Sequence, residues 1–87
     1  MKPHARRVRR IIDKLSARID QQAMQRGADA PHCVATVGSF HRAAGYLESD
    51  AGKLPFASVV AHVRILRRVV TTHAIMVRQR GLALRAK

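Results

Sequence analysis

Hydrophobic residues recur every three or four positions along three segments of the chain, the spacing at which side chains share one face of an α-helix. In residues 4–26 this stripe consists of Val8, Ile11, Ile12, Leu15 and Ile19. In residues 31–47 it consists of Cys33, Val37, Phe40, Ala44 and Leu47. Both segments are therefore predicted to be amphipathic helices, the first followed by Gly27 as a stop signal.

Residues 55–80 form the longest and most apolar of the three predicted helices. Its stripe consists of Phe56, Val59, Val63, Leu66, Val70 and Val77. Pro55 suits a first helical position, and Gly81 is expected to end the helix. Such a helix spans about 39 Å. A second apolar row, Ile65, Val69 and Met76, predicts cover on another side as well, from the same chain or from a partner.

These segments predict an all-α fold in which residues 1–87 form one domain. We expect a three-helix antiparallel bundle with long first and third helices, connected by residues 27–31 and 48–54 and followed by a basic tail at 81–87. Oligomerisation or docking on a partner would cover the remaining apolar area. Gly38 and Gly45 share one strip of the second helix, which indicates either close approach of another backbone or a merely weak helix.

Charge is the most unusual property of the chain. Seventeen lysines and arginines face five acidic residues, a formal net charge of +12. Most of the basic residues are arginines, whose planar guanidinium group can bind phosphate through two hydrogen bonds. Nucleic acid is thus the expected partner, and a merely solubilising surface is the alternative.

The basic positions of the first and third helices fall on arcs of their surfaces. They are Arg6, Arg7, Arg9, Arg10, Lys14, Arg18, Arg64, Arg67, Arg68 and Arg78. If the two helices pack side by side, these arcs merge into one surface that follows a phosphate backbone; otherwise they are separate solvated faces. No aromatic platform for bases is expected, because Phe40 and Phe56 are assigned to the core.

The sequence thus favours sequence-independent binding of a DNA or RNA backbone by a small accessory subunit of a nucleoprotein complex, either a homo-oligomer or part of a larger assembly. The alternative is an adaptor or inhibitor that docks on an acidic protein surface through Ile65, Val69 and Met76. A basic amphipathic first helix lying on an anionic membrane is a third interpretation, weakened by the lack of interfacial tryptophan or phenylalanine.

Neither catalysis nor a cofactor is expected. The acidic residues share no face, and the chain contains no G-x-S-x-G, Walker or G-x-G-x-x-G motif. His32, Cys33 and His41 match no metal-ligand spacing, so no metal is expected and Cys33 is interpreted as a small buried hydrophobic residue. His62 and His73 are expected at the edge of the core, hydrogen-bonded there.

The expected location is the cytoplasm. A single cysteine fits a reducing compartment, and no apolar run is long enough to span a bilayer. Asp13 and Lys14 interrupt the first apolar run too early for a secretory signal. The arginine-rich start also has the composition of an organelle transit peptide, but its continuation into a longer helix favours a structural role.

Overall fold

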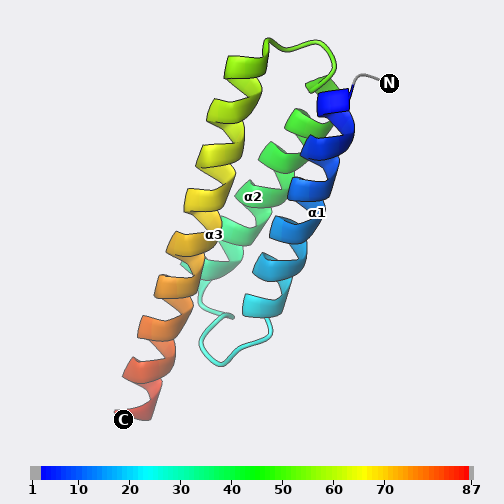
Figure 1. Ribbon diagram of the computed structural model, residues 1–87. Helices are drawn as coiled ribbons and strands as arrows, with labels where there is room; N and C mark the ends of the chain where they lie inside the picture. The colour runs from blue at the N-terminus through cyan, green and yellow to red at the C-terminus, as the bar shows by residue number, and fades with distance from the viewer. Residues whose placement is uncertain (1–2, 87) are drawn as a thin grey trace.

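The computed structural model describes residues 3–86 as three α-helices joined by two turns (Figure 1). Helix α1 spans Pro3–Gln22, α2 spans Pro31–Asp50 and α3 spans Phe56–Arg85. Consecutive helices run in opposite directions, and each helix contacts both others. The described residues contain no β-strand. The predicted all-α, three-helix antiparallel bundle is therefore confirmed.

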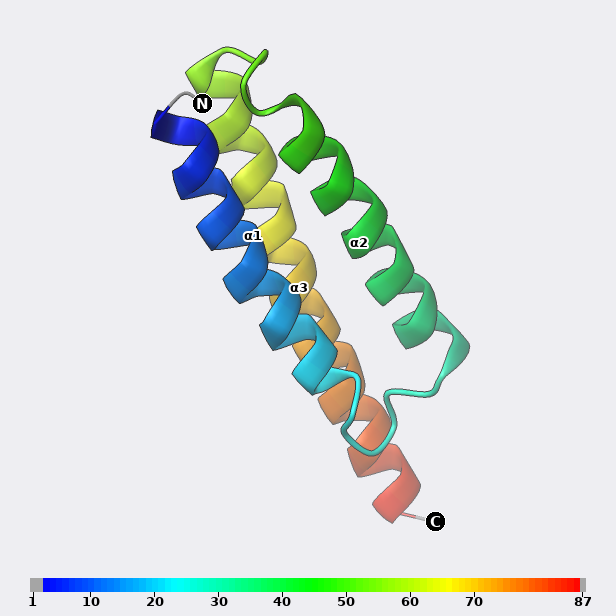
Figure 2. The ribbon, with the colours of Figure 1, turned by 90° about the vertical axis from the view of Figure 1, so that its right-hand side faces the viewer.

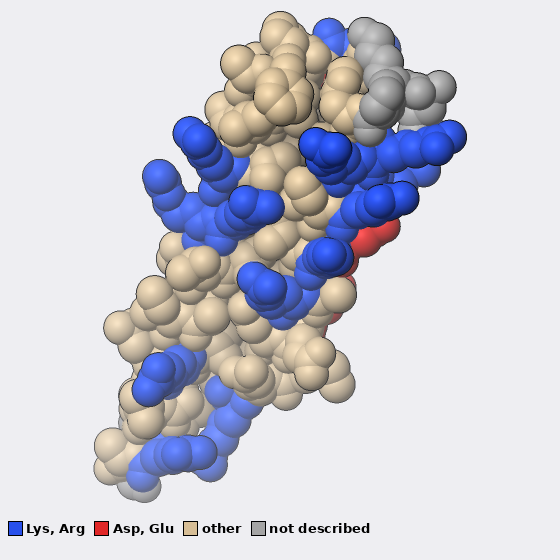
Figure 3. All heavy atoms as spheres, in the orientation of Figure 1, with Lys and Arg blue, Asp and Glu red and all other residues tan. Residues whose placement is uncertain are grey.

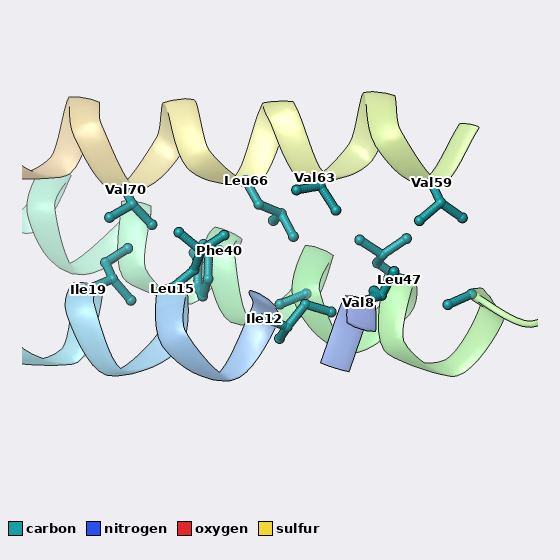
Figure 4. Packing of buried hydrophobic residues seen from close by; sticks show 12 residues of the cluster. Val8, Ile12, Leu15, Ile19, Phe40, Leu47, Val59, Val63, Leu66 and Val70 are labelled. Carbon is teal, nitrogen blue, oxygen red and sulfur yellow. The ribbon is translucent and has the colours of Figure 1, made fainter. Parts of the chain in front are cut away.

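The core consists almost entirely of aliphatic side chains from the predicted stripes. Figure 4 shows the α3 residues pointing toward those of α1, with Phe40 and Leu47 of α2 closing the third side. The residues from α1 and α3 are Val8, Ile12, Leu15, Ile19, Val59, Val63, Leu66 and Val70. Full burial of a side chain of this size stabilises the fold by about 1.5–3 kcal/mol. The periodicity thus predicted the inner face of each helix.

The helix ends differ from the prediction at several places. Helix α1 stops at Gln22 rather than at residue 26, and residues 23–30 form turns. This early stop lets Ala28 and Ala30 pack with Cys33 and Val77 in a second, smaller core cluster. Helix α2 continues past Leu47 to residue 50, because nothing in that stretch breaks a helix. At the start of α3, Pro55 is the N-cap residue rather than the first helical one.

The prediction that Gly81 ends the third helix is wrong, because α3 continues through it to Arg85. Gly81 instead allows close contact with the turn after α1. A Cβ atom on Gly27 would lie 2.8 Å from the backbone nitrogen of Gly81, and one on Gly81 would lie 3.2 Å from the carbonyl oxygen of Arg26. Gly27 also has a φ of +93°, a left-handed conformation that favours glycine. Gly27 and Gly81, which were both predicted to end helices, therefore contact each other.

Helix α3 is longer than the other two and extends beyond them, as Figures 1 and 2 show. Its 30 residues span about 45 Å, whereas the 20 residues of α1 and of α2 span about 30 Å each. The molecule is correspondingly elongated, with dimensions of 52 × 17 × 15 Å. The predicted tail is helical as far as Arg85, and Lys87 lies outside the described residues.

One side-chain assignment in α3 is wrong, and one of the alternatives for the glycines of α2 is excluded within the bundle. Phe56 is 64% exposed rather than buried, because it is the first residue of α3 and lies at the end of the bundle. Gly38 and Gly45 allow no close backbone contact within the bundle: a Cβ on Gly45 would meet nothing within 4 Å, and one on Gly38 would meet only the guanidinium of Arg42 at 3.5 Å.

Candidate nucleic-acid interface

Charge is distributed very unequally over the three helices. Helix α1 contains six basic and two acidic residues, and α3 contains six basic and no acidic residues. Helix α2 contains one basic residue, Arg42, and two acidic ones, Glu48 and Asp50. Most of the excess positive charge therefore belongs to α1 and α3.

The side of the molecule formed by α1 and α3 brings these charges together. In Figure 3, lysines and arginines form two bands over the two helices, with uncharged side chains between them, and acidic residues are visible only at one edge. Arg7 from α1 and Arg64 and Arg67 from α3 line the same groove, together with the apolar Ile11 and Val60. We call this side the α1–α3 face.

Helical spacing extends the basic band of α1 along this face. Because Arg7 and Ile11 line the groove, the shoulder of α1 that they occupy lies toward α3. Lys14 and Arg18 follow Arg7 by two and three turns on the same shoulder, and both are exposed. Arg10 is also exposed at the outer margin of this shoulder.

The band on α3 continues toward its projecting end. Arg78 lies on the same side of the helix as Arg67, three turns further along. It lines a second groove, of about 340 Å³, together with Arg26 and Arg85. Arg68, one turn after Arg64, is exposed on the outer surface of α3.

Arg6 and Arg9 lie apart from this face. Arg9 forms an ion pair with Glu48 of α2, with its Nε 3.2 Å from the carboxylate, so this second shoulder of α1 lies toward α2. Within the described residues it is the only lysine or arginine with a carboxylate oxygen within 4 Å. Arg6 is exposed on the side of α1 opposite its core stripe. All ten predicted basic site residues are thus exposed, but only Arg7, Arg64 and Arg67 among them line the groove.

Three functional candidates were not predicted from the sequence. Arg26 and Arg85 join the face only because the turn after α1 packs against α3 and because α3 continues beyond Gly81. Phe56 was assigned to the core, yet it lines the groove beside Arg7 and Arg64. No local pattern indicated that Arg26 and Arg85 would join the face, whereas the position of Phe56 at a helix start was an available signal that it lies outside the core.

His73 was expected at the core edge but is completely buried. Its Nδ1 donates a hydrogen bond to the side-chain oxygen of Gln22 at 2.7 Å, and its Nε2 has no partner among the described residues. Burial lowers the pKa of His73, because a charged imidazolium would lose its hydration. His62, by contrast, is exposed and contacts the carbonyl oxygen of Ser58. Both histidines lie outside the α1–α3 face.

Cys33 is also completely buried, as expected of a small hydrophobic residue. Burial raises the pKa of its thiol, against the smaller opposing effect of Arg80. His32 and His41 are exposed, and the imidazole of His41 lies 2.8 Å from the carboxylate of Asp20. Across residues 3–86, no three histidine, cysteine or acidic side chains are grouped as metal ligands.

The predicted partner row on α3 is divided between the core and the surface. Val69 packs in part against the main core and Met76 against the smaller cluster, where its sulfur also lies 4.0 Å from the Thr36 hydroxyl. Ile65 is 55% exposed. The row therefore offers one well-exposed apolar side chain rather than three.

Helices long and apolar enough to cross a membrane are absent from the part of the chain that the structure describes. Comparison of the chain with protein-family models, curated proteins and solved structures finds no match in any of the three.

Proposed function

We propose that this protein binds the phosphate backbone of nucleic acids, independently of sequence, through the α1–α3 face. The observation that carries the proposal is the gathering of unpaired arginines from two helices, including Arg7, Arg64 and Arg67, around one groove. Guanidinium groups bind phosphate oxygens strongly, and a surface without carboxylates attracts polyanions. Such binding releases counterions and needs no contact with base edges.

Under this proposal the protein would act in the cytoplasm as an accessory subunit of a larger nucleoprotein assembly. The exposed apolar residues on α3, Ile65, Ile75 and Leu82, would allow self-association or docking on another subunit. The rival proposal, an adaptor that docks on an acidic protein surface through Ile65, Val69 and Met76, is less well supported because two of these residues are partly used by the core.

The test is the salt dependence of binding to mixed-sequence single strands and duplexes, for DNA and for RNA. We expect log affinity to fall linearly with log salt, by about 0.7–0.9 for each phosphate contacted, with little difference between sequences. The matched variants are Arg67→Ala on the face and Arg42→Ala on α2, since each removes one exposed arginine from a helix.

Arg67→Ala should reduce the salt slope by a fraction of a unit to about one unit, and Arg42→Ala should leave it nearly unchanged. Negligible binding at low salt would contradict the proposal, as would equal effects of the two variants. Binding to an acidic protein that depends on Ile65 rather than on Arg67 would instead support the rival.

A further inference from the structure

The groove in the α1–α3 face has an apolar floor, which phosphate binding alone does not require. The space between the N-terminal halves of α1 and α3 measures about 280 Å³, and it is lined by Ile11, Val60 and Phe56 as well as by Arg7, Arg64 and Arg67. The arginines form a charged rim around a patch of hydrocarbon surface.

Phe56 is the unusual member of this patch. The other phenylalanine, Phe40, is 1% exposed in the core, whereas Phe56 is 64% exposed. It is not among the residues that pack against the main core cluster, and it lies in the groove within one helical turn of Val60. An aromatic ring next to guanidinium groups is the combination on which unpaired bases stack while their phosphates are neutralised.

The two forms of nucleic acid differ in what they can offer to this floor. In a duplex the faces of the bases are already stacked, so the outer surface presents phosphates, sugars and base edges. A single strand has free base faces, and their burial against Phe56 and the aliphatic floor would remove apolar surface from water. Only the single strand makes use of both the rim and the floor.

A protein helix would also cover an apolar groove, but this one is short. The apolar groove residues of α3 that are at least partly exposed, Phe56 and Val60, are one turn apart, about 6 Å, and Val63 in the next turn is only 7% exposed beside Arg64. A docking helix uses anchors over two turns or more, at i, i+3, i+4 and i+7. The length of the apolar floor fits a flat ring better than a helix.

We propose that the groove at Phe56 is a stacking site for one unpaired nucleobase, and that the α1–α3 face therefore prefers single-stranded over double-stranded nucleic acid. The base would lie between the ring of Phe56 and the side chains of Ile11 and Val60, with the flanking phosphates on Arg7, Arg64 and Arg67. This inference rests on the proposed function, and it adds the class of nucleic acid and the specificity-determining residue.

The experiment compares Phe56→Ala with Tyr46→Ala, each measured against a single strand and a duplex of about twelve nucleotides, a length within known site sizes. Tyr46 is the matched control because it is 77% exposed and lies on α2, outside the groove. Both residues are on the surface, so neither replacement should unfold the bundle. Circular dichroism melting confirms that.

Phe56→Ala should weaken single-strand binding by roughly 5- to 150-fold and change duplex binding by less than about twofold. Tyr46→Ala should change neither. A second variant, Phe56→Trp, should keep single-strand affinity and introduces the only tryptophan of the chain. Its fluorescence should be quenched by the single strand and not by the duplex, because quenching reports direct stacking.

The possible outcomes separate this inference from the proposed function. If Phe56→Ala leaves single-strand affinity unchanged while Arg67→Ala still weakens it, the stacking site is overturned and backbone binding stands. If the wild-type protein binds neither nucleic acid, both are overturned. If Phe56→Ala reduces only the binding of an acidic amphipathic peptide, the groove is a peptide site and the stacking proposal is overturned.

Discussion

The α1–α3 face and the outward side of α2 differ sharply in charge, although all three helices contribute to one core. The face carries arginines from two helices, while α2 exposes Gly45, Tyr46 and the single arginine Arg42. The inner stripe of α2 is as well buried as those of α1 and α3. Helix α2 therefore buries its inner stripe in this bundle without a basic outer surface.

This difference also bears on solubility as an explanation for the charge. If the surface were selected only for solubility, charged residues on any of the three helices would improve it, and acidic residues would do so as well as basic ones. Here most of the basic residues lie on α1 and α3, and the arginines that line the groove have no carboxylate oxygen within 4 Å among the described residues. The proposed polyanionic partner would account for that segregation, whereas a general solubility effect would not require it.

The largest expected effect comes from displacing α2 at the turn that leads into it. Gly27→Ala places a methyl group 2.8 Å from the backbone of Gly81 and requires a φ of +93°, so we expect a loss of about 2–4 kcal/mol in the free energy of unfolding. Chemical denaturation measures it. The control is Gly52→Ala in the other turn, where a Cβ meets nothing within 4 Å. Equal stabilities for the two variants would show that the turn does not hold α2 against α3.

Charge reversal tests whether the two sides differ in binding. The triple variant Arg7→Glu, Arg64→Glu, Arg67→Glu should lower affinity for single strands by about 100-fold or more near physiological salt, because three phosphate contacts become repulsive. It should melt no lower than the wild type, since its new carboxylates relieve repulsion among the remaining arginines. Arg42→Glu on α2 is the control. A comparable loss of affinity for that control would remove the distinction between the sides.

The pH dependence of stability tests the buried interior, through His73, independently of the charged face. The pKa of His73 is lowered by burial, so the unfolded chain binds a proton more readily than the folded one. The free energy of unfolding should therefore be unaffected by His73 above about pH 6.5, where the imidazole is neutral in both states. Below that pH it should fall as the unfolded chain takes up a proton, and His73 contributes at most about 1.4 kcal/mol per pH unit to this fall. His73→Leu should remove this component. His62→Gln, which removes an exposed imidazole from the same helix, is the control. If His73→Leu leaves the slope of unfolding free energy against pH unchanged, the pH dependence comes from other groups.

The smallest effect is expected on the open side of α2. Gly45→Ala adds a methyl group to an exposed helical position with nothing within 4 Å, so stability should rise by up to about 1 kcal/mol. Thermal melting at two protein concentrations measures it. A loss of stability that depends on concentration would show that another chain packs closely on α2, and the contrast between the two sides would need revision.

The sequence predicted the inner stripes well because a period of 3.6 residues determines which side of a helix is apolar. The same period places Arg7 and Arg9, two residues apart, on different sides of α1. The sequence could not determine which side of α1 would face α2 and which would face α3, because that depends on how the helices pack. The ion pair between Arg9 and Glu48 and the groove at Arg7 settle that arrangement only in three dimensions.

The errors have a common physical origin in the ends of the helices. Periodicity continues to place Phe56 near the stripe even where the neighbouring helix ends and no partner covers it. Glycine at position 81 was interpreted through its weak helix propensity, a cost of about 1 kcal/mol, whereas contact with the turn at Gly27 gives it a different role. Such contacts join residues far apart in the chain, and local patterns do not contain them.

The most direct test of the proposed interface is an NMR titration of the uniformly ¹⁵N-labelled protein with a short mixed-sequence single strand. We predict that the arginine side-chain Nε–Hε signals and the backbone amides of the α1–α3 face shift, including those of Arg7, Arg64 and Arg67, while the amides of α2 around Gly45 remain in place. Shifts concentrated on α2 or around Ile65, with the groove arginines unchanged, would contradict this account.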